Sequence, residues 1–176
     1  MSQPLYGAVE AGGTKFVLAV GASPSQLEDI RRVSTSPNPL ETIAETVAYF
    51  QRHPRLAALG IASFGPVDHR TGSITNTPKA GWQNFPLRDA LRRALHIPIG
   101  FETDVAAAAL AEARLGAAQG LANSVYLTIG TGIGGGAIVN RAPVQGLVHP
   151  EMGHLLVRRE PGELPDFAGV CPYHEG

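Results

Sequence analysis

The sequence predicts an α/β protein in which helices pack in layers on a sheet. Short apolar runs typical of strands alternate with helical patterns between residues 27 and 115. A glycine-rich turn at Glu10–Thr14 separates two further apolar runs, and a second turn at Gly130–Gly136 does the same. Because the second turn lies within a new pair of strands, we expect the chain after Gly120 to begin a second, similar unit that is unfinished at Gly176.

Periodicity and turn residues give the individual elements. In a helix at 40–52 we expect Leu40, Ile43, Val47 and Phe50 to share one face. Alanine, a strong helix former, dominates a later helix. The full set of expected elements is a hairpin at 5–10 and 15–20, a strand at Leu27–Val33, the helix at 40–52, a strand at Leu56–Ala62, a helix at 86–95, a strand at His96–Phe101, the alanine-rich helix at Val105–Leu115, a hinge at Gly116–Gly120 and a strand pair from Ser124.

The composition bounds the class of protein. The 176 residues, 44% of them hydrophobic, suffice for one domain with a core but are few for two complete domains. A net charge of -1 without any basic run argues against nucleic acid as the main partner. No apolar stretch is long enough to span a bilayer, and the N-terminus has no signal-peptide core. The single cysteine, Cys171, excludes an internal disulfide, so a cytoplasmic location is expected.

The two glycine turns have the composition of phosphate-binding loops. Glycine lets the backbone take a positive φ and lets a ligand come close, and successive exposed N–H groups suit phosphate oxygens. Two such turns suggest one polyphosphate held from two sides. The alternative is a pair of ordinary hairpins. It is weaker for Gly130–Gly136, where five glycines in seven residues lose more chain entropy than a simple turn requires.

Asp104 follows an apolar strand and precedes the alanine-rich helix. Its simplest role is the N-cap of that helix. Near two phosphate loops, the same carboxylate could also accept a proton from a hydroxyl. Phosphoryl transfer needs little from the protein beyond a base, positioning and charge stabilisation, so the acceptor would be an alcohol. The two roles can coexist.

Four side chains nearer the C-terminus have the chemistry of ligands. Glu151 and His154 are three residues apart, which suits one helical face or one tight turn. Cys171 and His174 offer a thiolate and an imidazole. Together with His154 they make three candidate zinc ligands, whereas a structural zinc site takes four. The alternative is a surface loop with an incidental cysteine and histidine.

Trp82 and the histidines outside the motifs above cannot be assigned a function from the sequence. Trp82, the only tryptophan, either forms the wall of a ligand pocket or covers the edge of the core, and the core role is favoured. His53, His69 and His96 lie beside turns and prolines, so we expect them to be solvated.

Taken together and in this order, the motifs resemble a known family. The chain resembles the ROK family (repressor, open reading frame, kinase), and within it the bacterial sugar kinases known as fructokinases or mannofructokinases. The resemblance covers essentially the whole chain, but only the N-terminal half or more of a typical member. The motifs that carry it are Gly7–Lys15, Ser63–Asp68, Thr77–Trp82, Thr103–Val105, Gly130–Gly136, His149–His154 and Cys171–His174.

The resemblance implies an actin-like ATPase fold, in which two ribonuclease-H-like domains close over ATP and a sugar. The first domain would occupy 1–117, and the start of the second would occupy 118–176. Asp104 would be the general base, and Glu10 would orient magnesium-bound water. The sugar ligands would be Thr103, Gly65, Glu151 and His154, and the ATP phosphates would lie against Gly12, Gly13, Thr14, Lys15, Gly130, Thr131 and Gly132.

The same likeness matches His154, Cys171 and His174 to three of the family's four zinc ligands, with a fourth, a cysteine, expected beyond Gly176. Relatives usually carry asparagine where this chain has Ala106, a change that would weaken the positioning of Asp104. We therefore expect the N-terminal piece of a sugar kinase. The 176 residues alone would be inactive, and their apolar side chains after Gly120 would lie uncovered.

The implied activity is ATP-dependent phosphorylation of a hexose, first of all fructose, with glucose or an N-acetylated hexosamine as the runner-up. A sugar-responsive repressor is a second alternative, but only nine residues precede Glu10, too few for a DNA-binding domain. A non-catalytic half-kinase that binds sugar or dimerises is a third. Homodimers are common among such kinases, so a homodimer stays open, with no nucleic acid or membrane as partner.

Overall fold

The larger part of the protein is built on a mixed five-stranded sheet. The computed structural model describes residues 3–130, 132–146 and 150–155. In the sheet, β1–β2 and β2–β3 are antiparallel, whereas β1–β4 and β4–β7 are parallel. The predicted hairpin, third strand and two later strands are confirmed. The strands are β1 (Leu5–Ala11), β2 (Lys15–Ser23), β3 (Gln26–Ser34), β4 (Leu56–Ser63) and β7 (Ile99–Thr103), in the order β3-β2-β1-β4-β7.

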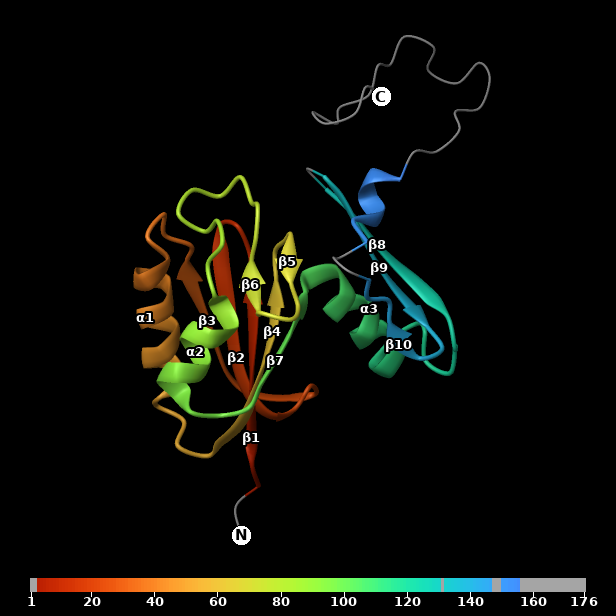
Figure 1. Cartoon of the computed structure of the whole chain (residues 1–176). Coiled ribbons are helices and arrows are strands. Elements are labelled where there is room, and N and C mark those ends of the chain that lie inside the picture. Colours follow the sequence, from red (N-terminus) through yellow and green to blue (C-terminus); the bar gives the residue numbers. More distant parts are fainter. Residues whose placement is uncertain (1–2, 131, 147–149, 156–176) are drawn as a thin grey trace, which may run out of the picture.

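Two helices, α1 (Pro39–Phe50) and α2 (Leu87–Leu95), cover one face of this sheet (Figure 1). The helices are where the sequence predicts them, but the predicted face of α1 is wrong in part, because Leu40 is 67% exposed. The buried face is centred on Thr46, about a third of a turn round the helix from Leu40. Threonine and tyrosine therefore supply much of the contact that the apolar pattern assigned to leucine and valine.

The core lies between these helices and the sheet. Side chains alternate along β1 between buried and exposed, as the two-residue period of a strand requires. Trp82 is fully buried, and its indole N–H donates to the carbonyl oxygen of Ser36 at 2.8 Å. The core role of Trp82 is thus confirmed. Its aromatic neighbours are Phe16, Phe64 and Phe85.

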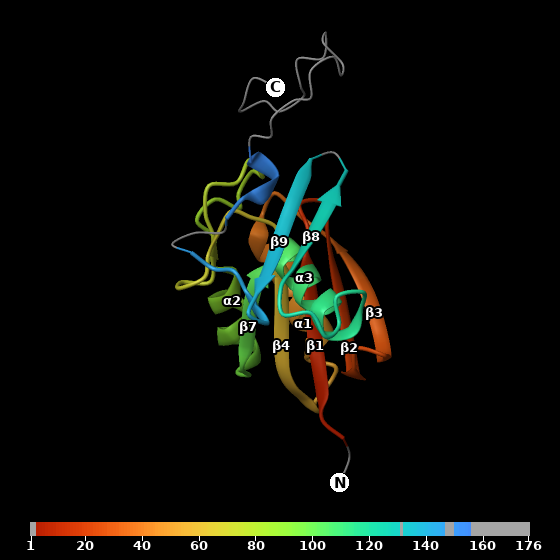
Figure 2. The same ribbon diagram turned by 90° about the vertical axis from the view of Figure 1, so that its right-hand side faces the viewer.

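The helix α3 (Asp104–Leu115) lies between the large sheet and a second, three-stranded sheet (Figures 1 and 2). The second sheet has the order β10-β9-β8 and is antiparallel throughout. The large sheet, α3 and the small sheet therefore form successive layers. The strands of the small sheet are β8 (Ser124–Ile129), β9 (Ile133–Val139) and β10 (Ala142–Pro143).

Three short elements complete the described chain. The strands β5 (Val67–Asp68) and β6 (Ser73–Ile74) pair with each other between β4 and α2, where no strand is expected from the sequence. A single turn of 3-10 helix, η1 (Met152–His154), packs against β9.

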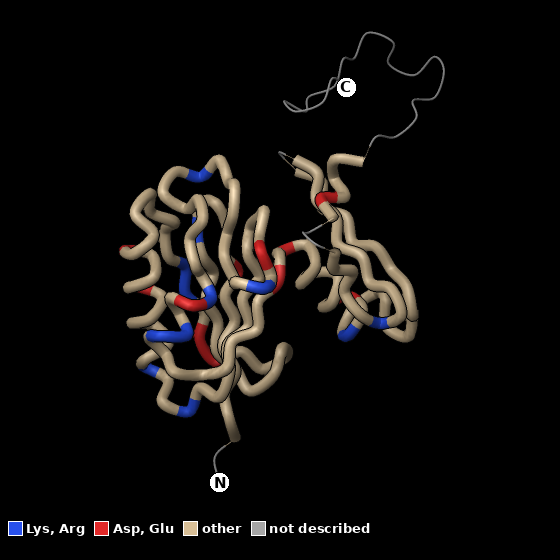
Figure 3. The backbone as a smooth tube through the Cα atoms, in the orientation of Figure 1, with Lys and Arg blue, Asp and Glu red and all other residues tan. Residues whose placement is uncertain are grey.

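The small sheet is apolar and poorly covered. The expectation of uncovered apolar side chains after Gly120 is confirmed, because Val125, Leu127, Ile129 and Ile133 are all exposed. The strands β8 and β9 carry no charged residue, whereas acidic and basic residues are interspersed over the five-stranded sheet and its helices (Figure 3). Within the described residues, none of the helices is both long enough and apolar enough to span a membrane.

Candidate functional site

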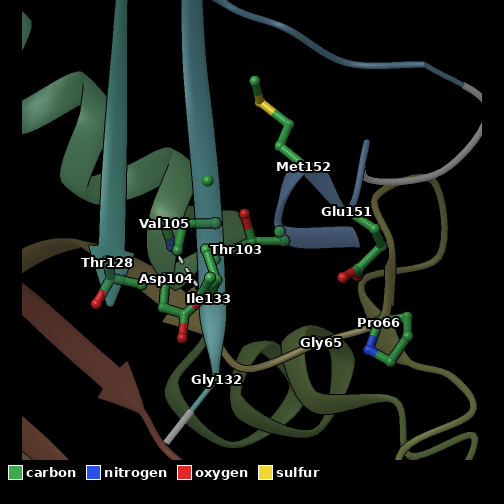
Figure 4. A pocket seen from close by; sticks show the side chains of 13 residues that line it. Gly65, Pro66, Thr103, Asp104, Val105, Thr128, Gly132, Ile133, Glu151 and Met152 are labelled. Carbon is green, nitrogen blue, oxygen red and sulfur yellow. Dashed lines mark hydrogen bonds between the residues drawn. The ribbon is translucent and has the colours of Figure 1, made fainter. Parts of the chain in front are cut away.

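A cavity of about 300 Å³ lies where β7 passes into α3, facing the β8–β9 hairpin and η1. Its walls come from four separate stretches of chain, and residues of all four lie around it (Figure 4). Because these stretches are far apart in the sequence, only the fold brings them together. Five residues that the sequence singled out share this cavity, namely Gly65, Thr103, Asp104, Gly132 and Glu151.

Asp104 is the first residue of α3 and is exposed to the cavity. The prediction that Asp104 caps the helix is wrong. The N-cap is the buried Thr103, whose hydroxyl oxygen accepts the N–H of Ala106 at 3.3 Å. Asp104 instead uses Oδ1 to accept the N–H of Val105 at 2.8 Å. Since Thr103 does the capping, the Asp104 carboxylate is oriented by the helix start and still faces the cavity, as a proton acceptor for a hydroxyl must.

Glu151 faces Asp104 from the other side of the cavity (Figure 4). It precedes η1 with φ 48° and ψ 49°, a left-handed conformation that non-glycine residues rarely adopt. Such strain is found at functional sites more than elsewhere. A Cβ placed on Gly65 would lie 3.7 Å from Glu151 Oε1, so these two residues border the same space. Two carboxylates therefore line one cavity from opposite walls.

The glycines of the second turn have two different roles. β8 ends at Ile129 and β9 begins at Ile133, and between them the N–H of Gly130 donates to the carbonyl oxygen of Gly132 at 2.9 Å. Gly134 to Gly136 belong to β9. A Cβ on Gly136 would lie 2.3 Å from the carbonyl oxygen of Val105, which leaves no room for a side chain. The glycine run thus lets α3 approach β9 closely and seats Asp104 against the hairpin.

The first glycine turn lies outside this cavity. It is tight, with the N–H of Gly12 donating to the carbonyl oxygen of Lys15 at 3.0 Å. Neither Gly12 nor Gly13 has a positive φ, so the expectation of a positive φ at these glycines is wrong. Open space surrounds the Cβ position of Gly13, which agrees with close approach of a ligand. Both glycine turns lie at the same, upper end of the molecule in Figure 1.

The other predicted site residues are less close to the cavity. Glu10 is exposed on β1, on the sheet face opposite to the α1–α2 core. His154 ends η1, and its N–H donates to the carbonyl oxygen of Glu151 at 3.0 Å. The described residues contain no group of three or more histidine, cysteine or acidic side chains placed to hold a metal. Thr131, Cys171 and His174 lie outside the described residues.

Two histidines differ from expectation. The sequence suggested that His53 and His69 are solvated, but each is largely buried beside a carboxylate. Nε2 of His53 lies 3.5 Å from Asp29 Oδ2, and Nε2 of His69 lies 3.4 Å from Glu102 Oε1. His96 is exposed, as expected. The expectation rested on neighbouring turns and prolines, whereas the carboxylates beside His53 and His69 belong to strands that are distant in the sequence.

Sequence reasoning also missed several residues of the cavity wall. Thr128 and Ile133 line the cavity from the two strands of the hairpin, and Met152 lines it from η1 (Figure 4). Met152 lies between Glu151 and His154 in a motif that the sequence did single out. Thr128 and Ile133 flank the glycine turn, so proximity to that turn was the available signal.

A family model described as "ROK family" matches residues 6–175. The chain belongs to the ROK family. It is 47% identical over 174 residues to a protein from Lactococcus lactis subsp. cremoris named fructokinase, covering 96% of this chain and 58% of that protein. It is 43% identical over 182 residues to the fructokinase of Zymomonas mobilis, covering 98% of this chain and 60% of that protein.

Solved structures agree with this assignment. A ROK family glucokinase from Streptomyces griseus, solved in complex with glucose and AMPPNP, matches with a TM-score of 0.75 and 31% identity. The match covers 88% of this chain and 51% of that glucokinase. The ROK chain therefore has the expected actin-like ATPase fold. It spans less than two thirds of the length of the curated relatives that it matches.

Proposed function

We propose that this ROK protein transfers the γ-phosphoryl group of ATP to a hydroxyl of a hexose, with fructose as the preferred substrate. The observation that carries the proposal is the position of Asp104, exposed at the start of α3 in a cavity whose opposite wall carries Glu151. The names of the Lactococcus and Zymomonas relatives support fructose. Glucose is the alternative, supported by the Streptomyces griseus structure.

In this proposal Asp104 accepts the proton of the sugar hydroxyl as that oxygen attacks the phosphorus atom. The base mainly orients the nucleophile, because the transition state of phosphoryl transfer is loose. Glu151 accepts hydrogen bonds from other sugar hydroxyls, and His154, Thr103 and Gly65 complete the sugar site. A sugar held on both sides in this way would present one hydroxyl to Asp104 and exclude water from it.

The ATP phosphates are proposed to lie between the two glycine turns, on Gly12 to Lys15 and on Gly130 to Gly132. The open space at Gly13, Gly130 and Gly132 fits close approach of a phosphate. Magnesium accompanies ATP in such reactions and neutralises charge on the phosphates. The exposed carboxylate of Glu10 has the oxygen chemistry that Mg²⁺ prefers, commonly through water.

The zinc proposal concerns His154, Cys171 and His174. His154 ends the same short turn that Glu151 begins, so a metal held through His154 would steady the wall that carries Glu151. A structural zinc site supplies folding energy rather than chemistry. Zinc content, measured by mass spectrometry of the native protein, tests this part independently of activity. One zinc per chain is expected.

The assignment of domains is also a proposal, with residues 1–117 forming the first domain and 118–176 beginning the second. A cytoplasmic location and a homodimer complete the proposal, without nucleic acid or membrane as a partner. The exposed apolar residues of β8 and β9 support association with further polypeptide on that side.

A substrate panel tests the function. The protein is isolated from its natural cells and given ATP, Mg²⁺ and either fructose, mannose, glucose or N-acetylglucosamine, and ADP release is followed. We expect the highest kcat/KM with fructose. A higher value with glucose or N-acetylglucosamine would reassign the substrate within the same reaction. Sugar binding without ADP release in all four assays would instead indicate a non-catalytic sugar-binding protein.

A further inference from the structure

Glu102, the residue before Thr103 on β7, makes three contacts with different parts of the chain. Its Oε1 lies 3.4 Å from Nε2 of His69 and accepts the N–H of Thr103 at 2.9 Å. Its Oε2 accepts a hydrogen bond from Nε2 of Gln145 at 2.7 Å. The side chain of Glu102 is only 16% exposed, and that of His69 is 19% exposed. A carboxylate with so little water depends on such partners.

Each contact leads to a different wall of the cavity. His69 follows the wall residues Gly65 and Pro66 by a few positions, through β5. Thr103 is itself a wall residue and is followed by Asp104. Gln145 follows β10, which is paired with β9, the strand of the glycine wall. Glu102 is therefore the common partner of three walls, although it does not line the cavity.

His69 is held between Glu102 and Phe101. Its Nε2 lies 3.4 Å from Glu102 Oε1, and its buried Nδ1 has no hydrogen-bond partner among the described residues. The ring of Phe101 packs edge-on against His69, with 6.4 Å between the centroids.

We infer that Glu102 is a positioning residue, which together with His69 and Gln145 holds the Gly65, Asp104 and β9 walls of the cavity in register for phosphoryl transfer. This inference rests on the proposed function. Its consequence is that loss of the carboxylate disturbs the placement of Asp104 against the sugar more than it disturbs binding of the sugar itself. Small misplacements of reacting groups lower rates strongly, by up to roughly 100-fold for about 1 Å.

The first test measures the steady-state kinetics of variants of the protein, each produced in the natural cells from an altered gene. Glu102→Gln replaces one acceptor oxygen by a donor, so one of the three donors loses its partner. We expect kcat to fall about 10-fold or more while the KM for sugar changes by less than about threefold. His69→Leu should behave in the same way, and His69→Gln, whose amide can contact the Glu102 carboxylate, should restore kcat to within about threefold.

Gln145→Leu has a matched control in Gln119→Leu. Both glutamines are exposed and donate one hydrogen bond, of 2.7 Å to Glu102 and 2.8 Å to the carbonyl oxygen of Arg114, respectively. Only Gln145→Leu should lower kcat. Equal kcat in all variants, or a lower melting temperature with unchanged kcat at 25 °C, would show a purely structural role and overturn the inference.

A second readout does not depend on activity. In the 176-residue chain, Glu102→Gln should speed amide hydrogen exchange at Thr103 and at Val144, which donates to the carbonyl oxygen of Ala137 at 2.9 Å. Leu59, bonded to the carbonyl oxygen of Pro98, is the control amide and should not change. Unchanged exchange at Thr103 and Val144 overturns the inference. If the wild-type protein releases no ADP with any sugar, the proposed function is wrong. The amide hydrogen exchange of Thr103 and Val144 still tests the structural role of Glu102 in that case.

Discussion

The hydroxyl of Thr35 donates a hydrogen bond of 2.7 Å to the carbonyl oxygen of Gly12. The N–H of Thr35 also donates to the carbonyl oxygen of Thr14, at 3.0 Å. Thr35 is 6% exposed and directly follows β3, so the end of one strand fastens both sides of the first glycine turn. The turn proposed to hold phosphate is thereby fixed before any ligand arrives.

Replacing Thr35 by valine tests this fastening. Thr35→Val keeps the shape and the N–H but leaves the Gly12 carbonyl oxygen without its partner, so the free energy of unfolding should fall by about 1–2 kcal/mol. The KM for ATP should rise several-fold while the KM for sugar stays close to the wild-type value. Urea unfolding and steady-state kinetics measure the two effects. Thr35→Ser, which retains the hydroxyl, should be close to wild type in both. An equal loss in the two variants would contradict the role of the hydroxyl.

Gly136 tests the close contact between β9 and α3. In Gly136→Ala the new Cβ would meet the Val105 carbonyl oxygen at 2.3 Å, a backbone atom that cannot rotate away. Overpacking of this kind lowers the free energy of unfolding by roughly 1–3 kcal/mol. The control is Gly100→Ala in β7, where the Cβ position is open and the change should be neutral or slightly stabilising. Thermal unfolding of both variants decides, and equal melting temperatures would contradict the packing argument.

Glu151 is expected to gain stability and lose function when replaced by glycine. Its φ of 48° is strained for any residue with a Cβ, so Glu151→Gly should raise the free energy of unfolding by about 1 kcal/mol. The same change removes a carboxylate from the cavity wall, so binding of fructose should weaken. Arg141→Gly is the matched control, because Arg141 has φ 66° and lies outside the cavity. It should gain similar stability without any change in fructose affinity, as measured by NMR titration.

Tyr49 is expected to make the free energy of unfolding decrease at high pH. Burial, together with the nearby negative charge of Asp29, raises the pKa of Tyr49 from 10.0 to about 12. Its hydroxyl donates to the Asp29 carbonyl oxygen at 3.0 Å. A raised pKa in the folded state means that the neutral form stabilises the fold below pH 10 and that this contribution is lost as the pH rises toward 12. The free energy of unfolding should therefore fall between these two values, and less steeply in Tyr49→Phe. Identical slopes in the two proteins would contradict the assignment.

The order of the elements could be predicted from the sequence because local patterns determine it. Side chains along β1 alternate between buried and exposed, which indicates one buried face of the strand. Leucines spaced by four along α2 indicate one buried face of the helix in the same way. The buried face of α1 is the exception that local patterns did not predict correctly. This face contains Thr42 and Thr46, and a purely apolar pattern cannot detect threonines that satisfy their hydroxyls on backbone oxygens, as these do.

The site could be predicted only where one short motif carries it. Asp104 and Glu151 lie in such motifs, and the structure brings both to one cavity. The capping role of Thr103 was missed because threonine and aspartate are adjacent and both are good N-caps, so the choice depends on where β7 ends. The partnership of His69 with Glu102 was missed because the fold, rather than sequence proximity, places the turn after β5 beside β7.

The glycine run shows the same limit in another form. Its composition correctly predicts that the backbone is closely approached there. It does not tell whether a ligand or another part of the chain approaches. The partner of Gly136 is the helix α3 of the same chain, and the partner of Gly135 is Met152. Distances between elements, which the sequence does not contain, separate a glycine needed for packing from a glycine open to a ligand.

The most direct test of the proposed reaction compares wild-type protein with Asp104→Asn, both isolated from the natural cells. Fructose binding and fructose-dependent ADP release are measured on each. We predict that the variant binds fructose with nearly wild-type affinity while kcat falls by roughly 10²- to 10⁴-fold, the usual contribution of a general base. Turnover by Asp104→Asn at the wild-type rate would contradict the role of Asp104 and, with it, the proposed site of phosphoryl transfer.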